Sequence, residues 1–172
     1  MKQLNCILLI DDDEPTNFLN KMTLEQAGCT RHIRIAQSGQ AALDYLRNSS
    51  PSLPGSDPGP ITPGTGSASG AGSVPDKARV RTGTSPSSDT NPRPDLIFLD
   101  INMPAMDGWE FLAQYRTLPP EKKADTVLIM LTTSLNPDDE LRTKTIPEIA
   151  GFENKPLKQD RLESLLKKYF NA

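Results

Sequence analysis

Short apolar runs alternate along the chain with longer segments in which apolar residues recur at the spacing of a helix. Runs of this kind are typical of strands buried between two layers of helices. They predict strands at residues 5–10, 32–36, 95–99, 127–131 and 151–153. The helical spacing predicts helices at residues 15–27, 39–47, 108–117, 137–145 and 159–170. This alternation indicates an α/β fold in which helices cover both faces of a parallel sheet.

Local signals support several of these helices. Pro15 and Pro137 suit the first turn of a helix, where the missing N–H has no helical partner. Asp107, followed three residues later by Glu110, resembles a capping box. The last helix has a single apolar stripe, formed by Leu162, Leu165, Leu166, Tyr169 and Phe170. A stripe at this spacing indicates core packing.

Residues 48–94 interrupt the pattern between the second helix and the third strand. They hold 9 of the 16 prolines and 7 of the 11 glycines, and they contain no aromatic residue. Such a stretch buries too little apolar surface to offset the entropy of ordering it. We therefore expect one domain over residues 1–172, with a disordered or flexible insertion at about 48–94. The role of this insertion is not evident from the sequence.

Composition excludes some functional classes. The 172 residues carry 19 basic and 22 acidic side chains, with a net charge of -3 and no basic stripe, so nucleic-acid binding is not expected. The first residues contain one lysine and a short apolar run before an acidic cluster, which fits neither a secretory signal nor a membrane span. We expect a cytoplasmic protein with no membrane partner.

Two cysteines and one histidine offer little chemistry. Cys6 and Cys29 have neither metal-ligand spacing nor the arrangement of a disulfide framework, so both are interpreted as reduced packing residues. His32 lies in a predicted strand and is interpreted as a packing or edge residue.

Polar residues follow four of the predicted strands directly. Asp11, Asp12 and Asp13 follow the first strand, Asp100 follows the third, Thr132 follows the fourth, and the last strand leads to Lys155. Ligands of open parallel sheets bind beyond the carboxyl ends of the strands, so these side chains are expected to converge. Clustered carboxylates repel one another unless a cation compensates, and hard oxygen ligands suit Mg²⁺ together with phosphate. The cluster therefore indicates phosphate chemistry, with Asp100 as a nucleophile.

Each of these residues also has a simpler interpretation. The acidic residues 11–14 can cap the following helix, Thr132 can be a turn residue, and Lys155 can be a solvated charge. Asp100 is harder to explain in this way, because a carboxylate directly after four apolar residues lies where burial is costly. Taken together, the residues favour a functional site.

The same residues resemble the receiver domains of two-component signalling, and chemotaxis-type single-domain regulators in particular. The resemblance is carried by Ile-Leu-Leu-Ile-Asp-Asp at 7–12, Asp-Leu-Ile-Phe-Leu-Asp-Ile-Asn-Met-Pro-Ala-Met-Asp-Gly at 95–108, Met-Leu-Thr-Thr at 130–133 and Lys-Pro at 155–156. It implies a flavodoxin-like fold, in which a doubly wound, five-stranded parallel sheet has the strand order 2-1-3-4-5. The insertion departs from typical members.

The resemblance implies a role for each acidic residue. Asp100 is expected to be the phosphoacceptor and a Mg²⁺ ligand, with Asp12 as a direct ligand and Asp11 as a mostly water-mediated one. Asn102 is expected to bind the ion through its backbone carbonyl. The phosphoryl donor is then a histidine kinase or a histidine phosphotransfer protein, and the chain catalyses only its own phosphorylation and dephosphorylation.

Further expectations concern the switch that follows phosphorylation. Thr132 is expected to be the switch hydroxyl, Lys155 the ion-pair partner of the acyl phosphate, and Phe152 an aromatic that changes rotamer, although Phe152 equally fits plain core packing. Output then passes to an unidentified downstream protein, through a changed surface or onward phosphotransfer. Pro147, near the end of the fourth predicted helix, leaves the shape of the adjacent partner surface open.

Two details complete the resemblance. The bond between Lys155 and Pro156 is expected to be cis. Asn102 and Ser134, each two positions after a site residue, are expected to influence how fast water removes the phosphoryl group.

Two other functions fit parts of the sequence. Asp11 and Asp13 have the Asp-x-Asp spacing of haloacid-dehalogenase phosphatases, in which Asp11 would be the nucleophile, Asp13 the acid/base, and Thr132 and Lys155 the phosphate binders. However, Pro15 stands where that motif has threonine or valine, and no acidic pair follows Lys155. The second alternative is an interaction module that keeps the fold and signals without phosphorylation.

Overall fold

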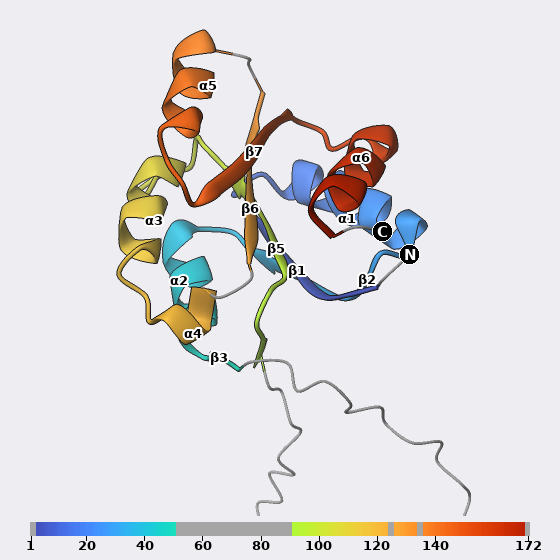
Figure 1. Cartoon of the computed structure of the whole chain (residues 1–172), viewed down its shortest axis with the longest axis horizontal. Coiled ribbons are helices and arrows are strands. Elements are labelled where there is room, and N and C mark those ends of the chain that lie inside the picture. Colours follow the sequence, from blue (N-terminus) through green and yellow to red (C-terminus); the bar gives the residue numbers. More distant parts are fainter. Residues whose placement is uncertain (1–2, 51–90, 124–125, 134–135, 171–172) are drawn as a thin grey trace, which may run out of the picture. The chain divides into compact units, whose positions relative to one another are not determined.

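A five-stranded parallel sheet forms the centre of the protein (Figure 1). The structure is a computed structural model that describes residues 3–50, 91–123, 126–133 and 136–170. The strands of this sheet are β1 (Leu4–Ile10), β2 (Thr30–Ala36), β5 (Leu96–Asp100), β6 (Val127–Thr132) and β7 (Ile149–Asn154). Their order is β2-β1-β5-β6-β7, which confirms the predicted order 2-1-3-4-5 of the five main strands.

The five predicted helices are present, with small differences at their ends. They are α1 (Glu14–Ala27), α2 (Gly39–Arg47), α3 (Gly108–Tyr115), α5 (Pro137–Lys144) and α6 (Gln159–Phe170). A short helix that was not predicted, α4 (Pro120–Lys123), follows α3. Because α5 ends at Lys144, Pro147 lies just beyond the end of the helix.

Helices cover both faces of the sheet (Figure 1). One face packs against α2 and α3 in a core that includes Leu43, Leu46 and Phe111, and the partly buried Ile146 and Ile149 extend it beside α5. The other face packs against α1 and α6, through Leu24, Leu162 and similar residues. Alternate residues of each central strand therefore enter different cores, as expected for a doubly wound sheet.

The predicted helix starts are confirmed. Asp107 and Glu110 form a reciprocal capping box at the start of α3. Pro15 and Pro137 lie in the first turns of α1 and α5. Among the described residues, no helix is long and apolar enough to cross a membrane.

The two cysteines and the histidine lie in the environments expected from the sequence. Cys6 and Cys29 are buried and free, in agreement with a packing role. His32 is exposed on the edge strand β2, so it is an edge residue. The bond between Lys155 and Pro156 is cis, as expected.

Both ends of the predicted insertion belong to the described structure, and residues 51–90 lie outside it. Ser49 and Ser50 form the strand β3 (Ser49–Ser50), which pairs in parallel with β4 (Asn91–Pro92). The Tyr45 hydroxyl of α2 donates a 2.7 Å hydrogen bond to the carbonyl of Pro92, and the Lys122 ammonium of α4 donates one to the carbonyl of Ser49. The chain therefore leaves and re-enters the domain at adjacent, anchored points.

We propose on this basis that residues 51–90 are an insertion into a single domain. Replacing them with a linker of about six residues, a usual length for such connections, should leave the fold intact. Each doubling of loop length costs about 0.6 kcal/mol, so the shortened protein should gain about 1 to 2 kcal/mol in free energy of unfolding. Urea denaturation followed by circular dichroism measures this change. Loss of a single cooperative transition in the shortened protein would contradict the proposal.

Candidate functional site

The carboxyl edge of the sheet brings together the polar residues that follow its strands. Asp11 follows β1, Asp100 ends β5, Thr132 ends β6, and Lys155 follows β7. Since these four strands are consecutive neighbours in the sheet, their ends form one continuous rim. The predicted convergence is therefore observed, with Asp11, Asp100 and Thr132 all buried.

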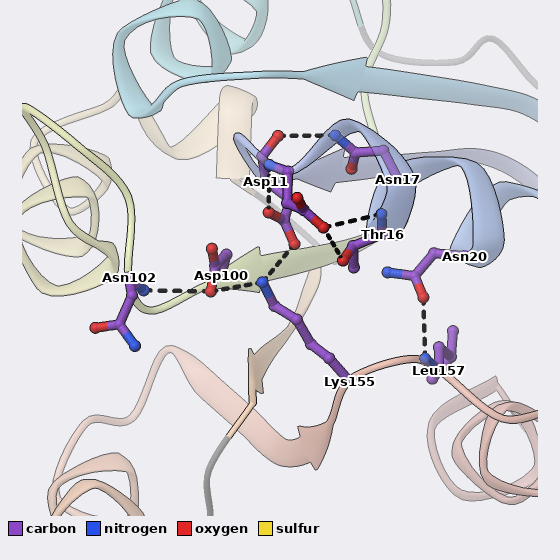
Figure 2. Close-up of polar contacts among 9 residues, drawn as sticks. Asp11, Thr16, Asn17, Asn20, Asp100, Asn102, Lys155 and Leu157 are labelled. Carbon is purple, nitrogen blue, oxygen red and sulfur yellow. Dashed lines mark hydrogen bonds and ion pairs between the residues drawn. The ribbon is translucent and has the colours of Figure 1, made fainter.

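A buried ammonium joins two of the carboxylates (Figure 2). The Lys155 Nζ lies 2.6 Å from Asp11 Oδ2 and 2.9 Å from Asp100 Oδ1. The side chain of Lys155 is only 7% exposed, so both ion pairs lie in a region of low dielectric, where charge interactions are strong. Its backbone N–H donates a 2.7 Å hydrogen bond to the carbonyl of Thr132, which fixes the chain beside β6. Lys155 is thus a site residue and not a solvated surface charge.

The turn after β1 divides its three aspartates between two tasks. Asp11 points inward, and its Oδ1 accepts a 2.9 Å hydrogen bond from the backbone N–H of Asp13. Asp12 is exposed at the rim. Asp13 caps α1, because its carboxylate accepts hydrogen bonds from the backbone N–H and the hydroxyl of Thr16. These bonds lower the pKa of Asp13.

Charge and burial set the protonation of the site. Burial raises the pKa of the Asp100 carboxyl to about 6, while the hydrogen bond from Lys155 opposes this rise and the neighbouring Asp11 carboxylate adds to it. For Lys155, burial alone would lower the pKa, but hydrogen bonds to Asp11 and Asp100 outweigh burial and raise it. The ammonium therefore remains charged between the two carboxylates.

The acidic residues fit a divalent cation. One carboxylate oxygen from each of Asp11, Asp12 and Asp100 lies within 4.8 Å of the others. In the part of the chain that the structure describes, the ion pairs made by these carboxylates come from Lys155 alone, so negative charge remains in excess. Carboxylate oxygens are the ligands that Mg²⁺ prefers.

The loop after β5 approaches the site closely. The backbone N–H of Asn102 donates a 3.2 Å hydrogen bond to Asp100 Oδ1, which orients the carboxylate. α3 begins at Gly108, which packs closely against this loop. A Cβ at this position would lie 2.7 Å from the carbonyl oxygen of Asp100, so the close approach requires glycine. Ala105 adopts a left-handed conformation with φ of 66°, a geometry that costs a residue with a Cβ about 1 to 2 kcal/mol.

The residues expected to form the switch lie near this rim. Thr132 is buried at the end of β6. Phe152, on β7, is half-buried against the core that α2 and α3 cover, which fits a core residue as well as a switch residue. Ser134 lies outside the described residues.

Two buried asparagines were missed by the sequence analysis. Asn17 Nδ2 donates a 2.8 Å hydrogen bond to the carbonyl of Asp11 (Figure 2). Asn20 Oδ1 accepts a 2.9 Å hydrogen bond from the backbone N–H of Leu157, two residues after Lys155. Their spacing of three residues on one helix was the available signal, because it places both on one face.

Known proteins resemble this chain in sequence and in fold. The family model of the response regulator receiver domain matches residues 84–167. Response regulator Rcp1 of Synechocystis sp. is 47% identical over 51 residues, which cover 30% of this chain and 33% of that protein. The chain therefore aligns with only about a third of this curated relative.

Solved structures extend the likeness to the whole fold. A two-component response regulator from Cytophaga hutchinsonii has a TM-score of 0.71 at 23% identity, over 99% of this chain and 100% of that one. The Vibrio cholerae chemotaxis protein CheY4 has a TM-score of 0.62 at 21% identity, over 96% and 98% of the two chains. At these identities the structures show a shared fold.

The ion pairs of Lys155 predict a specific effect on stability. Lys155→Met leaves two buried carboxylates facing each other, so the free energy of unfolding without divalent cations should fall by about 2 to 4 kcal/mol. Added Mg²⁺ should restore part of this loss, because it binds the folded state. Urea denaturation with and without Mg²⁺ measures both effects. Lys158→Met, at an exposed position, is the control, and equal unfolding midpoints for the two variants would contradict the prediction.

Proposed function

The chain belongs to the response regulator receiver family, and we propose that Asp100 accepts a phosphoryl group from a histidine kinase or a histidine phosphotransfer protein. The observation that carries the proposal is the Lys155 ammonium held between the carboxylates of Asp11 and Asp100. A receiver is a signalling module, so phosphorylation is its input and not a step in the turnover of a separate substrate.

Asp100 is the proposed nucleophile because of its position and its surroundings. It lies at the carboxyl end of the central strand β5, between the strands that supply Asp11 and Lys155. In the proposed step, a carboxylate oxygen of Asp100 forms a bond to phosphorus and the P–N bond of the donor phosphohistidine breaks. The leaving imidazole nitrogen keeps the electron pair of that bond and can then take up a proton. The product is an acyl phosphate on Asp100.

The neighbouring residues stabilise charge during this transfer. The Lys155 ammonium is already beside Asp100 and can follow the negative charge onto the new phosphoryl oxygens. The Thr132 hydroxyl is proposed to donate a hydrogen bond to the same oxygens. Asp11, Asp12, Asp100 and the backbone carbonyl of Asn102 are the proposed Mg²⁺ ligands. Bound Mg²⁺ would supply positive charge that offsets the carboxylates and the phosphoryl group.

The output follows from the added charge. A phosphoryl group adds about -1.5 to -2 charge and strong acceptor oxygens, which can draw Thr132 inward and shift a two-state equilibrium. Phe152 is proposed to change rotamer with Thr132. The altered surface then binds a downstream protein, or Asp100 passes its phosphoryl group on.

The phosphatase alternative receives no support from the geometry. It requires Asp13 as an acid/base beside Asp11, but the Asp13 carboxylate is occupied as the cap of α1. Asp13 is therefore not placed for that role.

Chemical phosphorylation tests the role of Asp100. Acetyl phosphate with Mg²⁺ should add one phosphoryl group to the unmodified protein, with acetate as the leaving group, whereas Asp100→Asn should take up none because it lacks the nucleophilic oxygen. Intact-mass spectrometry measures the uptake. Asp160→Asn, at an exposed position on α6, should label like the unmodified protein. Equal labelling of Asp100→Asn would contradict the proposal, and repeated hydrolysis of a phosphate ester that requires Asp11 would favour the phosphatase.

Metal binding distinguishes a phosphorylated receiver from an interaction module. Trp109 follows Gly108 directly, so its fluorescence should respond in a saturable way to millimolar Mg²⁺. Asp12→Asn should weaken this response without unfolding the protein, because Asp12 is exposed. A protein that shows neither a fluorescence change nor a thermal shift with Mg²⁺ would favour the module that signals by binding alone.

A further inference from the structure

The buried face of α1 is polar where it passes the site. Asn17 is 2% exposed and Asn20 is 1% exposed, whereas Phe18 and Leu19 between them are 62% and 48% exposed. This reverses the usual pattern of a surface helix, which buries its apolar residues and exposes its amides. Burial of a side-chain amide is costly unless it forms hydrogen bonds. The hydrogen bonds of these two residues therefore indicate what the face does.

The two asparagines use opposite ends of their amide groups (Figure 2). Asn17 donates through Nδ2 to the carbonyl of Asp11, and its own Oδ1 has no hydrogen-bond partner among the described residues. Asn20 accepts through Oδ1 from the backbone N–H of Leu157. One residue thus acts as a donor to the turn that carries Asp11, and the other acts as an acceptor from the segment after Lys155.

The segment after Lys155 has a second anchor on α1. Thr23, three residues after Asn20, has its Oγ1 3.3 Å from the carbonyl of Leu157 and 3.1 Å from the carbonyl of Leu19, so its single hydroxyl proton is shared between the two acceptors. The N–H of Leu157 is therefore held by α1, its carbonyl has a weaker contact with the same helix, and its side chain is buried. On the other side, the backbone N–H of Lys155 is held by the carbonyl of Thr132. These contacts fix Lys155 between β6 and α1.

We propose that Asn17 and Asn20 are positioning residues that set the spacing between the acidic turn and Lys155. Asn17 positions the backbone of Asp11 and, through it, the adjoining Asp12. Asn20, with Thr23, positions the segment that carries the Lys155 ammonium. The inference rests on the proposed function, since it concerns how α1 fixes the distance between the two parts of the phosphoryl-transfer site.

The two residues should affect divalent cation binding in different directions. If the acidic turn is displaced, fewer carboxylate oxygens converge and the affinity falls. If the Lys155 segment is displaced, an ammonium that competes for the same carboxylates moves away, so the affinity stays the same or rises. A general loss of structure would weaken binding in both cases. The difference in direction therefore separates positioning from plain destabilisation.

Mn²⁺ provides a probe that does not depend on phosphorylation, because free Mn²⁺ can be counted by electron paramagnetic resonance. In the full chain, Asn17→Leu should weaken Mn²⁺ binding by about tenfold, the scale at which residues behind metal ligands act. Asn20→Leu should bind Mn²⁺ at least as tightly as the unmodified protein. Both variants should be phosphorylated by acetyl phosphate about tenfold more slowly at saturating Mg²⁺.

Aspartate substitutions provide a matched pair. Asn20→Asp keeps an acceptor for the N–H of Leu157, whereas Asn17→Asp loses the donor to the carbonyl of Asp11. Both changes add one carboxyl group to the same buried face. Asn20→Asp should therefore retain most of the phosphorylation rate and Asn17→Asp should not. Thr23→Val, which removes the second bond to Leu157, should resemble a milder Asn20→Leu and remains informative if the leucine variants do not fold.

The outcomes separate this inference from the function on which it rests. An unmodified protein that neither binds Mn²⁺ nor takes up a phosphoryl group overturns the proposed function. An unmodified protein that does both, with Asn17 and Asn20 variants that change Mn²⁺ affinity in parallel or not at all, overturns the positioning roles alone. Opposite or unequal shifts, with recovery of the rate in Asn20→Asp, support them.

Discussion

The site depends on a single ammonium placed between two buried carboxylates. Lys155 lies within hydrogen-bonding distance of both Asp11 and Asp100, which come from neighbouring strands. Without that positive charge, the two carboxylates would repel each other where water is largely excluded. The ammonium does not balance all of the acidic charge, because Asp12 adds a third carboxylate at the rim. The same pairing therefore allows the fold to form and leaves the site with an affinity for a cation.

This constraint explains why α1 buries asparagines in place of apolar side chains. Asp11, Asp12 and Lys155 belong to loops at the sheet edge, and loops are less firmly held than the strands that they follow. Asn17 and Asn20 tie two of these loops to one rigid helix. The cost includes a buried carbonyl oxygen on Asn17 without a hydrogen-bond partner in the described part of the chain. Further along α1, Leu24 returns to ordinary core packing.

Most of the fold could be predicted from the sequence, because buried strands and amphipathic helices have different periods. The predicted ranges agree with the five main strands and five helices to within a few residues, and β7 is the most extended relative to its prediction. The two-residue strands β3 and β4 and the four-residue α4 are too short to give a periodic signal. The pattern of α1 misleads, since its exposed Phe18 and buried Asn17 invert the usual rule.

Part of the candidate site could also be predicted from the sequence, and part of it could not. The convergence of Asp11, Asp100, Thr132 and Lys155 follows from the rule that parallel strands present their carboxyl ends at one edge. That rule cannot say which groups pair, and the contact of Lys155 with both carboxylates depends on the sheet order and on the path of the loop after β7. Asn20 acts on a residue 137 positions away in the sequence, so its spacing from Asn17 indicates a shared helix face but not what that face binds.

The chain leaves and re-enters the described domain at the edge of the sheet opposite to the site. The chain leaves the described domain after β3 and returns through β4, which precedes β5 and therefore lies at the amino end of that strand. Asp100 lies at the carboxyl end of β5, and the acidic turn and Lys155 lie at the same edge. The described chain is therefore interrupted at the amino edge, away from the strand ends of β1, β5, β6 and β7 that form the site. The parallel sheet thus separates the edge where the proposed insertion joins the domain from the edge that holds the charges in place.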